Sequence, residues 1–283
     1  MGRQLLSRLP GALGTSRTSG RDVTMDIVNR EQVLSVIDRL SPELIVNTAA
    51  MTSVDGCERD PDAARRIHVD GTQHLIEACR VSGSRLVHLS TNYVFDGEAG
   101  PYAEGDDPNP LSLYGQTKFE SEGLVLEADE SALVIRTAVF YGPQYDRPNF
   151  VTWALKELIL GHAIRVVTDE WANPTYAPDL ADSILALVNG NSVGGLYHGA
   201  GPDYFSRYDL VMALCGIFDL DRDLVTPIVS ADLGQDAPRP ARAGLKTDKI
   251  QSAIGGVFRP LEENLEKLKE WIGDPESWAG RKA

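Results

Sequence analysis

Tyr114 and Lys118 are the residues with the clearest chemical potential, and they lie four apart in a segment that reads as the first turns of a helix. Residues four apart share one face of a helix, so the Lys118 ammonium can lie beside the Tyr114 phenol. A free tyrosine titrates near pH ~10, and a nearby cation favours its phenolate form. We therefore expect a lowered pKa for Tyr114, which could then exchange a proton with a carbonyl or alcohol oxygen near neutral pH.

Ser90 and Thr91 end an apolar run that precedes this pair. A hydroxyl at the end of a neighbouring strand can hold the same substrate oxygen by a hydrogen bond. A Tyr-x-x-x-Lys spacing occurs by chance in many helices, so the pair gains weight only from the block around it. The three cysteines are scattered and the five histidines lack ligand spacing, so we assign no metal and expect reduced cysteines.

Apolar runs alternate with helical patterns along the chain, which is typical of βαβ units and a parallel sheet. The expected fold is therefore α/β with a doubly wound parallel sheet, in which ligands bind beyond the carboxyl ends of the strands. Buried strands are expected at 44–48, 86–90 and 133–137, and helices at 30–40, 61–82, 112–128, 149–160, 206–218 and 261–272.

The chain is acidic, with a formal net charge of −14 over 283 residues. That charge argues against a nucleic-acid partner. Asp is abundant and Lys is scarce, at 24 and 7 residues, which favours a halophilic surface over that of an ordinary acidic enzyme. No apolar run approaches the ~20 residues of a membrane span, so we expect no membrane partner and a cytoplasmic location.

The block V-H-L-S-T-N-Y-V-F-D-G, followed by an acidic Gly/Pro loop and P-L-S-L-Y-G-Q-T-K-F-E-S-E, carries a resemblance. It resembles the extended short-chain dehydrogenase/reductase family, in its dTDP-4-dehydrorhamnose reductase branch, from Gly2 to about Trp271. The resemblance implies a Rossmann-like dinucleotide-binding domain at 1–140. It further implies a smaller substrate-binding region at 141–272, partly interleaved with the first domain, and a C-terminal tail at 273–283.

The family's first strand and most of its G-x-x-G-x-x-G loop are absent from this sequence. Residues 1–9 look like the end of that loop running into its helix, with Gly2 as the third glycine. This interpretation accounts for the basic, acid-free first 21 residues better than a targeting signal does. We expect a native product that starts upstream, and the alternative is a shortened protein without turnover.

The resemblance assigns Thr91, Tyr114 and Lys118 as the catalytic triad. Tyr114 would donate a proton to a keto oxygen while NADPH delivers hydride to the carbon. Lys118 would bind the nicotinamide ribose and tune Tyr114, and Thr91 would hydrogen-bond the carbonyl oxygen.

The cofactor implied by the resemblance is NADPH, with NADH as the alternative. Ser16 and Arg17 follow the expected second strand, where a basic residue often meets the 2′-phosphate, although a solvated Arg17 is about equally plausible. Asp26 could border the adenine or cap a helix. The implied cofactor-binding residues are Gly2, Ser16, Arg17, Asp26, Ile27, Thr48, Ala49, Ala50, Thr52, Ser90, Tyr114 and Lys118.

The substrate side departs from the family pattern at Asn92, where the reductases usually carry Asp, and this change could alter specificity or weaken turnover. Trp171 could stack on a sugar or base, or be a core residue. Arg239 is a candidate for the nucleotide diphosphate, since a guanidinium pairs well with phosphate oxygens. The implied substrate-binding residues are Thr91, Asn92, Tyr93, Asn149, Trp171 and Arg239.

The leading hypothesis is NADPH-dependent reduction of a nucleotide-linked 4-keto-6-deoxysugar, serving rhamnose or other polysaccharide biosynthesis. A dehydratase usually has Asp-Glu after its catalytic Thr, whereas Asn92-Tyr93 follows Thr91 here. A nucleotide-sugar epimerase stays open as an alternative. A non-catalytic NADP-binding subunit resembling the regulatory subunit of methionine adenosyltransferase also stays open. The sugar, the nucleotide and the assembly are open, with a homodimer and a Mg²⁺ bridge between subunits among the options.

Overall fold

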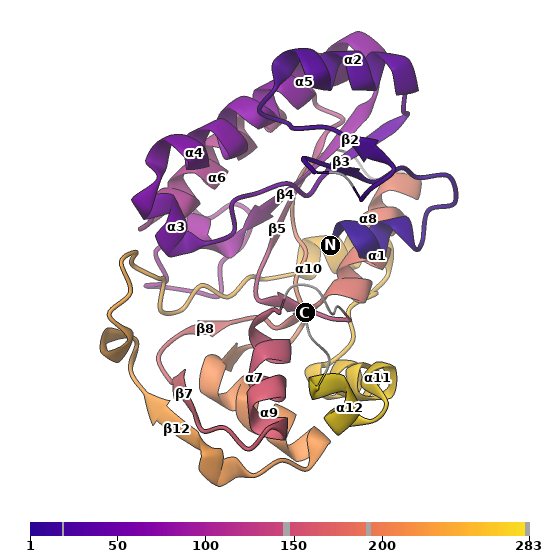
Figure 1. Ribbon diagram of the computed structural model, residues 1–283. Helices are drawn as coiled ribbons and strands as arrows, with labels where there is room; N and C mark the ends of the chain where they lie inside the picture. Colours follow the sequence, from indigo (N-terminus) through magenta and orange to yellow (C-terminus); the bar gives the residue numbers. More distant parts are fainter. Residues whose placement is uncertain (19, 144–147, 191–193, 281–283) are drawn as a thin grey trace.

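A four-stranded parallel sheet forms the centre of the protein (Figure 1). The computed structural model describes residues 1–18, 20–143, 148–190 and 194–280. The strand order β10-β5-β4-β3 confirms the predicted doubly wound parallel sheet. The strands are β3 (Leu44–Asn47), β4 (Arg85–Thr91), β5 (Leu133–Thr137) and β10 (Gly195–His198).

Helices cover both faces of this sheet, because its apolar strands present side chains to either side. Leu86 of β4 packs with residues of α5 and α6. Its neighbour Val87 points to the opposite face and packs with residues of α8. The first layer holds α2 (Arg30–Leu40), α5 (Gly71–Ser82) and α6 (Leu113–Ala128), and the second holds α1 (Gly2–Leu6), α8 (Ala177–Asn189) and α10 (Asp248–Ile254).

The helix α6 starts where its sequence provides a cap. The Ser112 side chain accepts a hydrogen bond from the Gly115 backbone N–H at 3.3 Å. A Cβ atom at Gly115 would lie 2.2 Å from the Tyr93 carbonyl oxygen, so only glycine allows this approach. The first turn of α6 is thereby held against the segment that follows β4.

The short strands β1 (Thr15–Ser16) and β2 (Val23–Thr24) form a separate parallel pair. Within the described residues, β3 is paired on one side only, with β4. A Cβ atom on Gly2, at the start of α1, would lie 3.3 Å from the Thr48 hydroxyl. The chain start therefore lies against the end of β3.

A second region contains its own apolar core below the sheet (Figure 1). Its elements are α7 (Phe150–Ile159), β7 (Ile164–Val167), α9 (Arg207–Phe218), β12 (Val225–Ile228), α11 (Leu261–Ile272) and α12 (Pro275–Ala279). Two small pairs of strands connect this region to the sheet, namely β6 (Phe140–Tyr141) with β9 (Thr175–Tyr176) and β8 (Trp171–Ala172) with β11 (Phe205–Ser206).

The end of the chain differs from the expected loose tail at 273–283. The helix α12, which spans Pro275–Ala279, follows α11, and Trp278 is buried in the core of the second region. An indole ring supplies a large apolar area, and its burial stabilises this short helix against the core. Residues 281–283 of the expected tail lie outside the described residues.

No described helix is long and apolar enough to cross a membrane.

The remaining elements are short. The short elements are α3 (Val54–Arg59), α4 (Pro61–Arg65), the π-helical turn η1 (Arg66–Asp70) and the 3₁₀ turns η2 (Asn92–Val94), η3 (Arg222–Leu224) and η4 (Ser230–Leu233).

A buried ion pair joins α6 to the sheet. Arg136 of β5 donates to Glu122 of α6 at 2.7 Å, and both side chains are almost fully buried. The Arg136 guanidinium also lies 5.0 Å from the centroid of the Phe95 ring. Removing one partner would leave the other charge buried without compensation.

We expect Glu122→Ala to lower the free energy of unfolding by about 3–5 kcal/mol, because Arg136 would lose its counter-ion. Urea denaturation measures this change. Glu120→Ala on the same helix is the matched control, since Glu120 pairs with Arg65 at the surface. That exposed pair should contribute only about 0–1 kcal/mol. Equal losses in the two variants would contradict the assignment.

Candidate active site

The predicted Thr91 and Tyr114 meet at the carboxyl end of β4. The Thr91 side chain hydrogen-bonds the Tyr114 hydroxyl. Thr91 Oγ1 also accepts the Tyr93 backbone N–H at 3.2 Å, which fixes the turn from β4 into η2. The close contact at Gly115 brings the first turn of α6 to this point. Two hydroxyl groups from different elements can therefore face one substrate oxygen.

Two rings hold Tyr114 edge-on. His68 of η1 lies 5.7 Å away at an interplanar angle of 76°, and Tyr93 lies 5.8 Å away at 83°. Such edge-to-face contacts are favourable between aromatic rings. They fix the direction in which the Tyr114 hydroxyl points.

The expected lowering of the Tyr114 pKa is wrong for this structure. Burial raises the pKa of Tyr114 to about 12, and the hydrogen bond with Thr91 opposes this only in part. The Lys118 amine donates instead to the Leu89 backbone oxygen at 2.6 Å. Burial also lowers the pKa of Lys118 to about 8, against the opposing charge of Glu122. Burial thus favours the uncharged form of both side chains.

The predicted cofactor residues of the first half cluster around the end of β3. Gly2 lies against Thr48, and the following segment carries Ala49, Ala50 and Thr52. Ser90 Oγ is buried and has no hydrogen-bond partner within the described part of the chain. A buried hydroxyl without a partner is costly unless a bound group satisfies it. The glycine contact and this free hydroxyl fit a cofactor at the strand ends.

The other predicted cofactor residues have mixed surroundings. Arg17 is exposed just after β1, and Ser16, the last residue of that strand, is half-buried. Asp26 accepts the Val28 backbone N–H at 3.1 Å and so forms a local turn, while Asn29 is the residue that caps α2. Ile27 is buried in the core between α2 and α5.

Several predicted substrate residues already have partners in the protein. Arg239 forms a two-pronged ion pair with Asp55 of α3, at 2.8 and 3.0 Å. Asn149 caps α7 through a hydrogen bond to the Thr152 backbone N–H. Trp171 is half-buried, and its ring centroid lies 5.6 Å from that of Tyr204.

Asn92 has a structural role that the sequence did not indicate. Its Nδ2 atom donates to the Ala243 backbone oxygen at 2.8 Å, and its Oδ1 atom accepts from Thr91 at 3.4 Å. An amide can serve both contacts, whereas a carboxylate can only accept hydrogen bonds. Asn92, which stands where the family usually has Asp, therefore joins η2 to the distant segment around Ala243.

Sequence reasoning missed four charged or titratable residues near these groups. His68 and His88 are buried, and Glu170 lies 3.8 Å from Arg207. Arg207 also hydrogen-bonds the Tyr93 side chain. Glu170 directly precedes the predicted Trp171, but its pairing with Arg207 of α9 depends on tertiary contacts alone.

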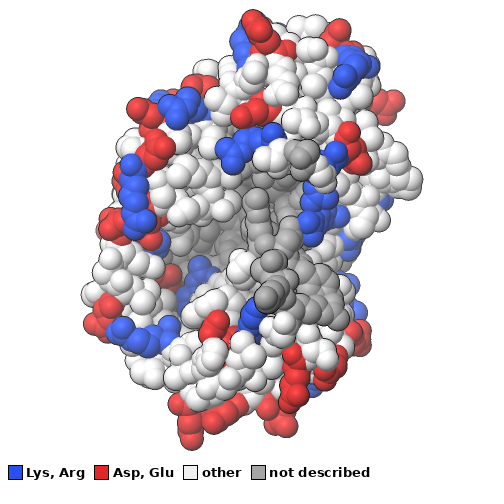
Figure 2. Space-filling model, viewed as in Figure 1, with Lys and Arg blue, Asp and Glu red and all other residues white. Residues whose placement is uncertain are grey.

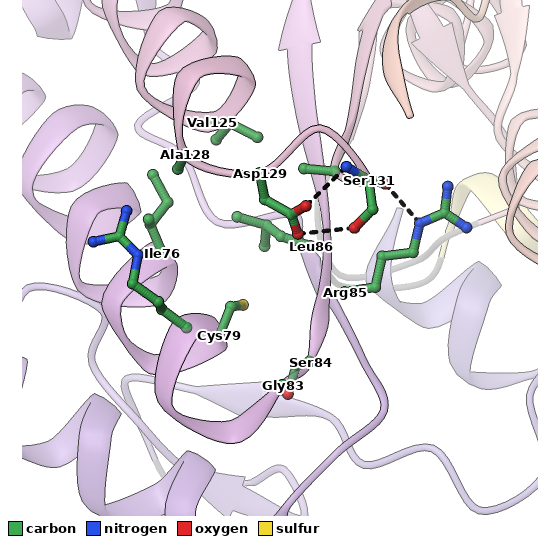
Figure 3. A pocket seen from close by; sticks show the side chains of 12 residues that line it. Ile76, Cys79, Gly83, Ser84, Arg85, Leu86, Val125, Ala128, Asp129 and Ser131 are labelled. Atoms are coloured by element: carbon green, nitrogen blue, oxygen red, sulfur yellow. Dashed lines mark hydrogen bonds between the residues drawn. The ribbon is translucent and has the colours of Figure 1, made fainter. Parts of the chain in front are cut away.

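The hollow centre of one face is visible in Figure 2, with Lys and Arg side chains around it and acidic side chains on the outer margins. A separate cavity of about 270 Å³ lies at the opposite end of the sheet (Figure 3). It is lined by Arg85 and Leu86, where β4 begins, whereas Thr91 ends that strand. This cavity is therefore distinct from the candidate active site.

The Asp55–Arg239 pair should stabilise the protein down to acidic pH. The Arg239 hydrogen bond lowers the pKa of Asp55 to about 2. Its contribution is therefore present above the ordinary carboxyl pKa of ~3.9 and is lost as the pH falls through about 2. We expect Asp55→Asn to lose about 1 kcal/mol at pH 7, a difference that shrinks between pH 4 and pH 2 in urea titrations.

Asp236→Asn is the control for this prediction. Asp236 pairs with Arg59 at the surface, where both side chains are well exposed. The control should change stability by less than about 0.5 kcal/mol. A pH-independent loss in Asp55→Asn would contradict the ion-pair explanation.

We expect Asn92→Asp to lower the free energy of unfolding by about 1–3 kcal/mol, because a carboxylate oxygen would face the Ala243 carbonyl. Thermal unfolding measured at pH 7 tests this. Gln116→Glu is the control, since it makes the same change from amide to carboxylate at an exposed position on α6. An unchanged or increased melting temperature in Asn92→Asp would show that the amide bridge contributes nothing.

Comparison with known proteins supports the resemblance seen in the sequence. The RmlD substrate binding domain family matches residues 1–272. A dTDP-4-dehydrorhamnose reductase of Aggregatibacter actinomycetemcomitans is 37% identical over 245 residues, 82% of each chain. A probable low-salt glycan biosynthesis reductase of Haloferax volcanii is 32% identical over 254 residues, which cover 88% of this chain and 84% of the relative.

A solved structure has the same fold. The dTDP-4-dehydrorhamnose reductase of Bacillus anthracis in complex with NADP superimposes with a TM-score of 0.84 at 29% identity, over 94% of each chain. The family match covers nearly the whole chain, and the curated relatives exceed 30% identity. The chain belongs to the RmlD substrate binding domain family, in the dTDP-4-dehydrorhamnose reductase branch of the extended short-chain dehydrogenases/reductases.

Proposed function

We propose that this protein catalyses the NADPH-dependent reduction of a nucleotide-linked 4-keto-6-deoxysugar. The observation that carries this proposal is the hydrogen bond between Thr91 and Tyr114 at the carboxyl end of β4, with Lys118 one turn further along α6. The names of the relatives, two of them dTDP-4-dehydrorhamnose reductases, support the same reaction.

The cofactor would lie across the ends of β3 and β4. NADPH, when bound, supplies the hydride that reduces the keto carbon. Gly2 leaves space beside Thr48. Ser90 Oγ has no hydrogen-bond partner among the described residues, so it would be available to bond the cofactor. Arg17, exposed just after β1, is the proposed partner of the 2′-phosphate, which a guanidinium binds well.

Tyr114 would act as the proton donor. Because burial holds its pKa at about 12, the phenol keeps its proton at neutral pH and can give it to the oxygen that gains charge during reduction. The Thr91 hydroxyl would hold the same oxygen in place. Positioning of this kind lowers the barrier without any further chemistry from the protein.

The substrate would enter from the side of the second region. Tyr93, Glu170 and Arg207 form a half-buried polar group next to Tyr114. The raised pKa of Glu170, which burial causes, suits a side chain that exchanges hydrogen bonds with sugar hydroxyls. Arg239 and Trp171 are the proposed contacts for the diphosphate and a ring, and Arg239 would have to share its charge between Asp55 and the substrate.

We further propose that the enzyme works in a cytoplasm of high salt as a homodimer. The formal charge of −14 and the scarcity of lysine suit a strongly hydrated surface in salt. All three cysteines are buried and free, in keeping with a reducing compartment. Sedimentation equilibrium in high and low salt tests both the assembly and the salt dependence.

The first test of function is titration of NADPH into the protein in high salt, followed by nicotinamide fluorescence and thermal stability. Stabilising binding followed by oxidation of NADPH with a dTDP-4-keto-6-deoxysugar would support the reductase. Binding without turnover on any keto sugar, together with co-purification of a synthetase, would favour the non-catalytic subunit instead.

We expect Tyr114→Phe to lower the turnover number by about 10²–10⁴-fold while the dissociation constant for NADPH stays nearly unchanged, because only the transferred proton is removed. Steady-state oxidation of NADPH and fluorescence titration measure the two quantities. Tyr197→Phe on the edge strand β10 is the matched control and should keep full activity. Retained turnover in Tyr114→Phe would refute the mechanism.

A further inference from the structure

A chain of buried polar groups runs behind Lys118 and is not used by the proposed mechanism. It starts at Asn47, where β3 ends, passes through His88 of β4 and reaches Lys118 and Ser121 of α6. All four residues are at least 95% buried. Buried polar groups must pair donor with acceptor, so the proton positions along this chain follow from its geometry.

The orientation of the Asn47 amide determines the first link. The Ala49 backbone N–H donates to Asn47 Oδ1 at 3.1 Å. The Nδ2 atom of Asn47 therefore faces Nδ1 of His88, at 3.2 Å. Because an amide NH₂ group can only donate, Nδ1 of His88 must accept, and the neutral ring carries its proton on Nε2.

The second link joins His88 to α6. Nε2 of His88 lies 3.1 Å from Ser121 Oγ and 3.0 Å from Lys118 Nζ. The Ser121 hydroxyl gives its own proton to the Lys118 backbone oxygen at 2.7 Å, so its oxygen can accept from His88. An ammonium group has no lone pair, and only an uncharged amine can accept the same N–H.

We propose that His88 is a positioning residue which, with its tautomer set by Asn47, makes Lys118 a hydrogen-bond acceptor and so favours its uncharged amine over the ammonium. In that form Lys118 Nζ accepts from His88 and donates to the Leu89 backbone oxygen. Above its pKa of about 8, the neutral amine thus stays against β4, and below that pH an added proton removes the lone pair that accepts from His88.

The other charged and titratable groups around Lys118 leave this arrangement intact. Glu122 favours the ammonium, but it is paired with Arg136. The pKa of His88 is held well below its usual value by burial, so the ring stays neutral. His68 is neutral too, with the opposite tautomer, because its Nε2 accepts the Met51 N–H at 3.0 Å and its Nδ1 lies 2.8 Å from the Thr117 hydroxyl.

Protonation of Lys118 would move its side chain towards the cofactor, an inference that rests on the proposed function. Once protonated, Lys118 presents three N–H groups and no acceptor, so the contact with His88 becomes repulsive. The amine must then turn towards another acceptor, and the nicotinamide ribose hydroxyls would provide one. His88 thus favours release of the charged lysine towards the cofactor.

The test is NMR spectroscopy of the full chain, which needs neither substrate nor cofactor. ¹⁵N-histidine spectra at pH 8.5 should show His88 protonated on Nε2 and His68 on Nδ1, which makes His68 an internal control. ¹³C-lysine spectra should give Lys118 a midpoint near its lowered pKa of about 8, while exposed lysines titrate near ~10.4. A His88 proton on Nδ1, or a Lys118 midpoint near ~10.4, would overturn the proposal.

Asn47→Asp tests the direction of control. A carboxylate accepts both neighbouring N–H groups, so His88 should move its proton to Nδ1 and accept from the Lys118 ammonium. We expect the Lys118 midpoint to rise by about 1 pH unit, while the His68 tautomer stays the same. An unchanged His88 tautomer in a folded variant would refute the role of Asn47, and the wild-type spectra decide the proposal if the variant does not fold. Absence of turnover would refute the proposed function and leave these readings unaffected.

Discussion

The close packing of α6 against η2 is the contact on which the site depends. Gly115 lies so near the Tyr93 carbonyl oxygen that any side chain would push the helix away. That approach brings the Tyr114 hydroxyl to Thr91 and the Lys118 amine to the backbone of β4. The ion pair between Glu122 and Arg136 secures the same helix two turns further on. Backbone contact in the first turn and a buried ion pair near the middle of the helix fix its position and rotation.

Burial, rather than charge, controls the chemistry of this site. It raises the pKa of Tyr114 and lowers that of Lys118, so both move towards their neutral forms. Two buried histidines stay neutral beside them and take opposite tautomers. A phenol that keeps its proton suits reduction better than oxidation, because reduction consumes that proton. The protein thus keeps the phenol protonated, while the lysine on the same helix loses its proton more readily than an exposed lysine does.

A short segment, residues 239–243, connects the second region to the site. Arg239 pairs with Asp55 of α3, and the Ala243 backbone oxygen accepts from Asn92. The backbone N–H of Trp171 donates to Ala241 in the same segment. These contacts join the end of β4, the start of α3 and the substrate side in one network. They also explain why an amide stands at position 92, since a carboxylate could not donate to a carbonyl.

The sequence alone determined the fold class, the positions of the main helices and strands, and the grouping of Thr91, Tyr114 and Lys118. Those conclusions rested on periodicity, capping residues and a family motif, which are local in the chain. The sequence did not predict the C-terminal helix α12, because only packing against the second core orders the segment around Trp278. The environment of each reactive group also required the tertiary structure. Desolvation reversed the expected pKa of Tyr114, and the partners of Lys118, Asn92 and Arg239 come from distant segments, whose contacts no local pattern encodes.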